Sequence, residues 1–285
     1  MKKSAIVEIK GGLGNQVFQY SFGKYLENIG FRVLYNLDFF NKSSKNLDNV
    51  TERDFLLKEL SCEINEVSRF KQKLSDTFNY LINSKKIKKN FPFINNHIYQ
   101  YLKEKDYDKD LEYKNYLILN YFDGYWQNNI FHLKTQKESL LNIFDINNQD
   151  IEKLNNGRVL IHVRRRDYLK LGINLPENYY ENSINLLKKE LKEFEFDIFT
   201  DDKEWVLNQN IFSDFRKIYG EDNEPIKSFK KMICYKHFII ANSTYSYLAA
   251  FFGEKQESKV LMPYRWSTKK EKDFLTDNSW KKVQF

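Results

Sequence analysis

After residue 158, short apolar runs alternate with stretches of helical periodicity, and this alternation constrains the fold more than any other feature. Val159–Val163 and Phe196–Thr200 predict strands. The residues after them predict helices over Glu177–Phe194 and Lys203–Asn208. The order helix, strand, helix, strand continues over residues 226–262. Strands that alternate with helices predict a parallel sheet with helices on both faces.

The first third of the chain begins with the same kind of unit. Residues 5–9 and 31–38 predict strands. Between them lie a glycine loop, Gly11–Asn15, and a helical pattern over residues 17–29. Strand, loop, helix and strand in this order form a βαβ unit.

A polar stretch separates the two regions. A strand at Tyr116–Phe122 and a helix over Leu133–Phe144 are expected before it, and Asn142–Arg158 is rich in Asn and is the best linker candidate. We therefore expect an α/β protein with two domains, residues 1–150 and 151–285, that face one another across a cleft.

The net charge and the cysteine content limit which binding partners and which cellular compartment are expected. The net charge is +7 with a pI near 9.0, which fits a solvated surface, an anionic substrate, an anionic membrane face or nucleic acid. The densest basic run, Asn83–Phe91, is typical of an exposed segment that could touch acidic lipid rather than of a nucleic-acid arm. Cys62 and Cys234 indicate no disulfide framework, and we expect a cytoplasmic protein, at most peripheral on the inner face of the plasma membrane.

Polar clusters follow four of the predicted strands. Ligands of parallel sheets bind at the carboxyl ends of the strands, so four such clusters in one chain predict a shared site. The clusters are Gly11–Gln16, His162–Asp167, Thr200–Asp202 and Asn242–Ser246.

The sharpest cluster contains three consecutive arginines. The planar guanidinium fork suits phosphate, so Arg164 is a candidate phosphate ligand, and His162 lies two residues earlier on the same face. Because side chains alternate along a strand, Arg164 and Arg165 cannot point the same way unless the strand is ending. One could bind a ligand while its neighbour pairs with Asp167 or another carboxylate. The alternative is a pair of solvated or ion-paired arginines.

The sequence NSTYS ends a predicted strand and opens a helix. Free backbone N–H groups at a helix N-terminus bind phosphate, which makes Asn242, Ser243, Thr244 and Ser246 candidate ligand contacts. Ordinary N-capping by Ser243 or Thr244 is the alternative.

Other motif matches are weak. A dinucleotide fingerprint fails because Val17 stands where the third glycine should be, although Asp38 keeps an NAD-linked oxidoreductase as an alternative. Lys105–Asp110 contains the D-x-D pattern of metal-dependent glycosyltransferases but is more typical of a solvated charge run. No His or Cys spacing predicts a metal site.

Taken together, the clusters resemble the α-1,2-fucosyltransferases of glycosyltransferase family 11. The matching stretches are GGLGNQVFQY, HVRRRDY, FDIFTDDKEWV and FIIANSTYSYLAAFFG, in the family's order over nearly the whole chain. The resemblance implies a GT-B-like fold of two Rossmann-like domains, with an acceptor-side first domain and a second domain that binds the nucleotide sugar. It also implies GDP-L-fucose as donor, inversion at the anomeric carbon, and no required metal or cofactor. The acceptor would be a galactose-containing glycan or lipid-linked oligosaccharide, fucosylated at the galactoside 2-hydroxyl in O-antigen or capsule synthesis.

The resemblance also suggests roles for individual residues. Arg164 would hold the β-phosphate, Asn15 would approach the reaction centre, and Asp167 is a candidate general base for which pairing with an arginine is the favoured alternative. The remaining substrate-binding candidates are His162, Arg165, Asp201, Asp202, Asn242, Ser243, Thr244, Ser246, Gly12, Gly14 and Gln16.

Three departures from the family pattern leave the donor open. Arg166 stands where the family usually has glycine, Tyr247 and Leu248 stand where it has two tryptophans, and an aspartate is replaced near Ser228–Lys231. Another nucleotide sugar, or a catalytically silent sugar-nucleotide binding module, therefore remain alternatives.

Overall fold

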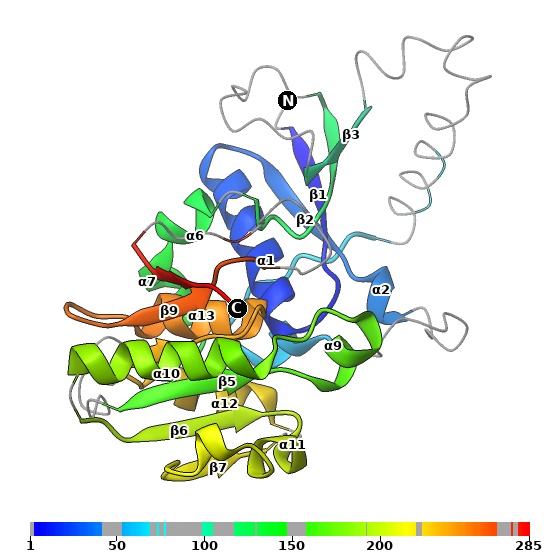
Figure 1. Ribbon diagram of the computed structural model, residues 1–285. Helices are drawn as coiled ribbons and strands as arrows, with labels where there is room; N and C mark the ends of the chain where they lie inside the picture. Colours follow the sequence, from blue (N-terminus) through cyan, green and yellow to red (C-terminus); the bar gives the residue numbers. More distant parts are fainter. Residues whose placement is uncertain are drawn as a thin grey trace. The chain divides into compact units, whose positions relative to one another are not determined.

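The computed structural model describes most of the chain as two compact units, Met1–Leu140 and Leu141–Phe285 (Figure 1). The described residues are 3–41, 53–68, 73, 77, 99–104, 117–128, 130–146, 158–191, 193–220, 224–266, 275 and 279–285. The basic run Asn83–Phe91, the D-x-D stretch Lys105–Asp110 and most of the predicted linker lie outside these residues.

The first unit is built on a parallel sheet with the strand order β2-β1-β4-β3. Its strands are β1 (Ser4–Glu8), β2 (Arg32–Asn36), β3 (Tyr99–Lys103) and β4 (Leu119–Asp123). Its helices are α1 (Leu13–Asn28), α2 (Asp38–Asn41) and α6 (Phe131–Lys134), with a 3-10 turn, η1, at Leu56–Glu59. Helix α7 (Lys137–Asn142) spans the boundary at which the second unit begins. The apolar residues of β1 are fully buried, as in a parallel sheet that is covered on both faces.

The second unit contains a parallel sheet with the order β10-β9-β8-β5-β6-β7. The strands are β5 (Val159–Val163), β6 (Phe196–Thr200), β7 (Lys217–Tyr219), β8 (His237–Ile239), β9 (Val260–Pro263) and β10 (Lys281–Val283). The helices are α9 (Arg166–Leu171), α10 (Glu177–Leu191), α11 (Lys203–Leu207), α12 (Pro225–Ile233) and α13 (Thr244–Gly253), with a 3-10 turn, η4, at Asn210–Phe212. Helix α10 covers one face of the sheet, and α12 and α13 cover the other (Figure 1).

This strand order is the Rossmann order. The chain runs outward from β5 through β6 to β7, then returns to β8 beside β5 and runs outward again. The point between β5 and β8, where the direction reverses, is where such sheets bind ligands. The first sheet has its own reversal between β1 and β4. The predicted fold class of two Rossmann-like α/β domains is therefore confirmed, while the cleft between them stays a prediction.

The structure differs from the predicted helices and strands mainly in short elements. The strands predicted at Val159–Val163 and Phe196–Thr200 match β5 and β6. The helix predicted over Leu133–Phe144 is instead two short helices, α6 and α7, and the strands β3, β7 and β10 were not predicted. Among the described residues, no helix has the length and apolar character needed to cross a membrane.

Candidate functional site

The carboxylate of Asp201, at the end of β6, organises the loop that follows β5. It accepts hydrogen bonds from the backbone N–H groups of Arg165 at 2.8 Å and Arg166 at 3.2 Å. Its Oδ2 also lies 3.1 Å from Nη1 of Arg164, and its side chain is only 2% exposed. Asp201 thus satisfies backbone donors at the start of α9, as an N-cap residue would. The loop holds this shape because three donors converge on one buried carboxylate.

Arg164 is held between two carboxylates. Besides Asp201, its Nη2 lies 2.9 Å from Oδ1 of Asp167, so the predicted pairing of Asp167 with an arginine is present. Burial on its own would lower the pKa of Arg164, but the charges of Asp201 and Asp167 outweigh it and the pKa is raised. The guanidinium therefore stays charged and fixed, with 18% of its side chain exposed at the carboxyl end of β5.

Arg165 points to a different partner. Its Nε lies 3.0 Å from Oδ2 of Asp202, and its guanidinium stacks 3.9 Å above the ring centre of Trp205. Asp202 is also the N-cap of α11, because its Oδ1 accepts the backbone N–H of Trp205 at 3.1 Å. Because β5 ends at Val163, the two arginines diverge at the turn into α9, and each pairs with a different aspartate at the end of β6.

The other side of the reversal point is the start of α13. Ser243 occupies the N-cap position, but its hydroxyl makes no capping hydrogen bond to the helix. The hydroxyl of Ser246 is buried and donates to the carbonyl oxygens of Ala241 and Ser243, so it fixes the backbone of the turn. Capping by Ser243, the alternative reading of this motif, is therefore not observed, and Thr244 begins the helix as its first residue.

Asn242 ties this turn to its surroundings. Its amide donates to the carbonyl oxygens of Ile173 at 2.8 Å and Trp266 at 3.0 Å, while its own backbone carbonyl accepts the hydroxyl of Tyr168 at 3.2 Å. Because Tyr168 belongs to α9, this contact connects the segment that follows β5 and carries Arg164 to the start of α13. The buried Oδ1 of Asn242 has no hydrogen-bond partner among the described residues.

His162 lies in β5, two residues before Arg164, and is almost fully buried. Burial, together with the charge of Arg164, lowers its pKa to about 3, so the imidazole is neutral near pH 7. Within the described part of the chain, its buried Nδ1 has no hydrogen-bond partner. The reversal point between β5 and β8 therefore contains the unpaired polar atoms Nδ1 of His162 and Oδ1 of Asn242. Such atoms are rare, because each costs about 1–3 kcal/mol unless something satisfies it.

The side chain of Asn15 packs against the glycine loop of the first unit. Gly11 has φ of +81°, and a Cβ there would lie 2.5 Å from Nδ2 of Asn15. Gly12 is the N-cap of α1, and a Cβ there would meet nothing within 4 Å. Oδ1 of Asn15 accepts a hydrogen bond from the amide of Gln127 at 3.0 Å. Gly14 is buried in the first turn of the helix.

Gln16 fastens this loop to a distant segment. Its amide donates to the carbonyl oxygens of Gly11 and Asp54, both at 2.8 Å. Its Oε1 accepts the backbone N–H of Leu56 at 2.9 Å, and the side chain is fully buried. Gln16, a substrate-binding candidate from sequence, is thus engaged by the protein itself.

The departures from the family pattern fall in different environments. Tyr247 and Leu248 are fully buried in α13, where the ring of Tyr247 packs 4.7 Å from that of Trp280. The side chain of Arg166 is exposed at the start of α9. Residues 228–231 lie within α12. Arg166 lies just after β5, at the carboxyl end of the strand.

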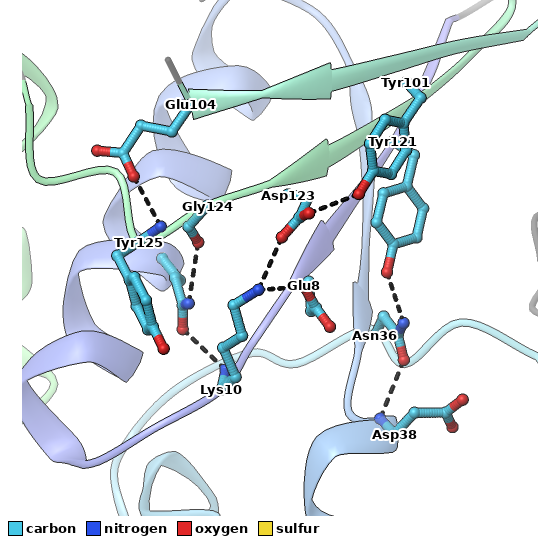
Figure 2. Close-up of polar contacts among 11 residues, drawn as sticks. Glu8, Lys10, Asn36, Asp38, Tyr101, Glu104, Tyr121, Asp123, Gly124 and Tyr125 are labelled. Atoms are coloured by element: carbon cyan, nitrogen blue, oxygen red, sulfur yellow. Dashed lines mark hydrogen bonds and ion pairs between the residues drawn. The ribbon is translucent and has the colours of Figure 1, made fainter. Parts of the chain in front are cut away.

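A second polar cluster, which the sequence analysis missed, lies at the reversal point of the first sheet (Figure 2). Nζ of Lys10 bridges Glu8, at 2.6 Å, and Asp123, at 2.7 Å. Asp123 also accepts the hydroxyl of Tyr101 at 2.5 Å. The available signal was positional, since Glu8 and Asp123 end β1 and β4. Tyr101 could not be found in this way, because it belongs to the unpredicted strand β3.

The turn after β4 is fastened beside this cluster. The carboxylate of Glu104 accepts the backbone N–H groups of Tyr125 at 2.8 Å, Gln127 at 2.5 Å and Asn128 at 2.8 Å. Gln19 connects the same turn to the cluster, because it accepts the backbone N–H of Lys10 and donates to the carbonyl oxygen of Gly124. Among the described residues, no group of three or more His, Cys, Asp or Glu side chains could hold a metal ion.

The role of Asp201 predicts a large effect of an isosteric substitution. Asp201→Asn should lower the free energy of unfolding by about 3 kcal/mol, because it removes the charge that Arg164 and two backbone donors share in a buried site. Asp214→Asn is the matched control, since Asp214 is exposed in the same unit. Urea denaturation monitored by circular dichroism measures both. Equal midpoints for the two variants would show that Asp201 does not organise the loop.

Comparison with known proteins agrees with this geometry. A family model described as glycosyl transferase family 11 matches residues 4–284. An Escherichia coli O-antigen biosynthesis glycosyltransferase, WbnK, is 27% identical, with 95% of this chain and 98% of that protein covered. An E. coli alpha-1,2-colitosyltransferase is 30% identical, with 93% of each chain covered. The fold resembles that of Arabidopsis thaliana FUT1, solved as a point mutant in complex with GDP, at a TM-score of 0.50 and 14% identity over 98% of this chain and 72% of that one. The NAD-linked oxidoreductase alternative is thereby set aside, and the chain belongs to glycosyltransferase family 11.

Proposed function

We propose that this glycosyltransferase moves L-fucose from GDP-L-fucose to the 2-hydroxyl of a galactoside, with inversion at the anomeric carbon. One observation carries the donor half of the proposal. Arg164 and the N-terminus of α13 lie at the reversal point of the second sheet, and Ser243 makes no capping hydrogen bond to α13. The hydrogen bond from the hydroxyl of Tyr168 to the backbone carbonyl of Asn242 connects the two loops that carry them. Both groups favour anions, and a nucleoside diphosphate presents charge to both at once.

The residues of this edge divide the work of donor binding and bond cleavage. Negative charge grows on the β-phosphate as the anomeric C–O bond breaks, and Arg164 with the first N–H groups of α13 offset that charge. This assignment uses protein donors alone and requires no metal. Oδ1 of Asn242 is a buried acceptor that suits a donor group of a guanine base, and Nδ1 of His162 is a second polar atom without a partner among the described residues. Asp201 and Asp202 act through the arginines that they hold.

The donor sugar has a specific runner-up. A relative with 30% identity carries the name alpha-1,2-colitosyltransferase, and Arg166 replaces the usual glycine on the ligand-binding edge. The O-antigen relative supports a role in surface-polysaccharide synthesis. A lipid-linked oligosaccharide at the cytoplasmic face of an anionic membrane is then the proposed acceptor, and the net charge of +7 favours such a surface.

A donor panel tests the proposal. The enzyme is incubated with GDP-L-fucose, GDP-linked colitose, GDP-mannose and UDP-galactose, each with and without a galactoside, and GDP or UDP release is measured. We expect acceptor-dependent GDP release with GDP-L-fucose. Release with GDP-linked colitose alone would replace fucose by the runner-up. Binding of GDP-L-fucose without turnover on any acceptor would instead indicate a silent binding module.

Substitution of Arg164 separates catalysis from binding. Arg164→Ala should lower kcat on the order of a hundredfold while donor KM changes less, because the arginine is needed most when the phosphate charge develops. Arg164→Lys should restore only part of the rate, since an ammonium lacks the two-pronged fork. Arg32→Ala, at an exposed position of the first unit, is the control.

Arg164 also satisfies Asp201 and Asp167, so folding must be measured beside the rates. Circular dichroism and the melting temperature establish the folded fraction of each variant. A folded Arg164→Ala protein with the turnover of Arg32→Ala would remove Arg164 from the mechanism.

A further inference from the structure

Helix α9, the short helix that follows β5, carries two leucines that keep about half of their surface in solvent (Figure 1). Leu169 is 46% exposed and Leu171 is 48% exposed, while most large apolar residues of the second unit are buried. A single exposed leucine needs no explanation. Two of them within three residues, on a helix of six, form a small apolar projection at the carboxyl end of β5.

The backbone beneath these leucines is held at both ends. Gly172 ends α9 with φ of +63°. Its N–H donates to the carbonyl oxygen of Leu169, and the N–H of Ile173 donates to that of Tyr168, both at 3.0 Å. These two bonds are the Schellman pattern of a capped helix end. At the other end, Asp201 accepts the first backbone donors of the helix. The leucines therefore project from a fixed helix rather than from a frayed one.

The charge around the leucines is positive. Lys170 lies between them in the sequence, and Arg166 begins the helix, and both are exposed. Arg166, Leu169 and Lys170 are spaced i, i+3, i+4 and so share one side of α9. The one carboxylate of the helix, Asp167, pairs with Arg164. We refer to Arg166, Leu169, Lys170 and Leu171 as the α9 face.

The composition of the α9 face favours one kind of partner. Nucleic acid would be bound by the cations but gains little from aliphatic leucines. A stable protein interface covers roughly 800 Å² on each partner, far more than two half-exposed leucines provide. The interface of an anionic bilayer suits both components, because leucines enter the acyl boundary while cations stay among the phosphates. The net charge of +7 attracts the whole protein to the same surface.

We propose that the α9 face docks on an anionic membrane surface. This inference deepens the proposed function and rests on it, since a lipid-linked acceptor is presented at such a surface. Helix α9 begins directly after Arg164 and Arg165, so the docking element and the proposed donor contacts belong to one segment. Docking through this helix brings the carboxyl edge of the second sheet next to the lipid headgroups.

Removal of the two leucines tests the docking. The full-length protein is sedimented with vesicles of phosphatidylglycerol and phosphatidylcholine, and with vesicles of phosphatidylcholine alone. We expect the wild type to bind the anionic vesicles. The double variant Leu169→Ser, Leu171→Ser should bind them about tenfold more weakly or worse, because apolar surface no longer enters the bilayer. Leu207→Ser is the matched control, since Leu207 is 56% exposed on α11 of the same unit and should leave binding unchanged.

A pair of lysine substitutions separates the α9 face from the overall charge. Lys170→Glu and Lys203→Glu change the net charge equally, and both lysines are exposed in the second unit. Lys170→Glu should weaken binding to the anionic vesicles by about tenfold, because it puts a negative charge among the headgroup phosphates. Lys203→Glu should have a much smaller effect. Equal losses would show that net charge alone, and not the α9 face, directs the protein to the surface.

Activity measurements separate docking from catalysis. Transfer to a soluble galactoside should be the same in the double leucine variant and in the wild type. Transfer to a galactoside-bearing lipid in anionic vesicles should fall with the loss of binding. Circular dichroism confirms that each variant is folded.

The outcomes distinguish this inference from the function on which it rests. A wild type that does not bind anionic vesicles, or a double leucine variant that binds them as Leu207→Ser does, would overturn the docking and leave the proposed function standing. A dimer that the double variant dissociates, without vesicle binding, would overturn it in favour of a second copy of the chain. A protein that binds vesicles through the α9 face but transfers no sugar would overturn the proposed function instead.

Discussion

The second unit depends on the ion pair between the buried carboxylate of Asp201 and Arg164. Three adjacent guanidinium groups repel one another, and the loop after β5 is stable only where counter-charges meet them. Asp201 meets Arg164 and also fixes two backbone N–H groups, so α9 begins at a defined place. The hydroxyl of Tyr168 then reaches the carbonyl oxygen of Asn242 and sets the start of α13. The proposed donor site is therefore the result of one carboxylate placed at the end of β6.

The two sheets apply the same topology to similar groups of charges. Each has a reversal point between neighbouring parallel strands, β1 and β4 in the first and β5 and β8 in the second. The first carries two carboxylates that share one ammonium, and the second carries a guanidinium between two carboxylates. In each unit, one cation shared by two carboxylates therefore lies at the carboxyl edge of the parallel sheet.

Much of the second unit could be predicted because its signals are local. β5 and β6 are apolar runs with polar ends, and the pairing of an arginine with Asp167 was expected from their closeness in sequence. From sequence, Asp201 was one alternative partner of Arg164, but the choice could not be settled because the pairing depends on β5 and β6 being neighbours in the sheet. The saturation of Gln16 by the Asp54–Leu56 segment depends on tertiary contacts in the same way. The group formed by Glu8, Lys10, Asp123 and Tyr101 was not predicted, because charged residues at strand ends are usually solvated. In addition, β3, which supplies Tyr101, has no distinctive apolar alternation.

Hydrogen exchange with and without GDP tests the central claim most directly, because it locates the donor site without relying on turnover. The account predicts slower exchange at the backbone amides of residues 164–168 and 243–247 in saturating GDP, and unchanged exchange at residues 5–10. Protection confined to the first unit, or no protection at either loop of the second, would contradict it.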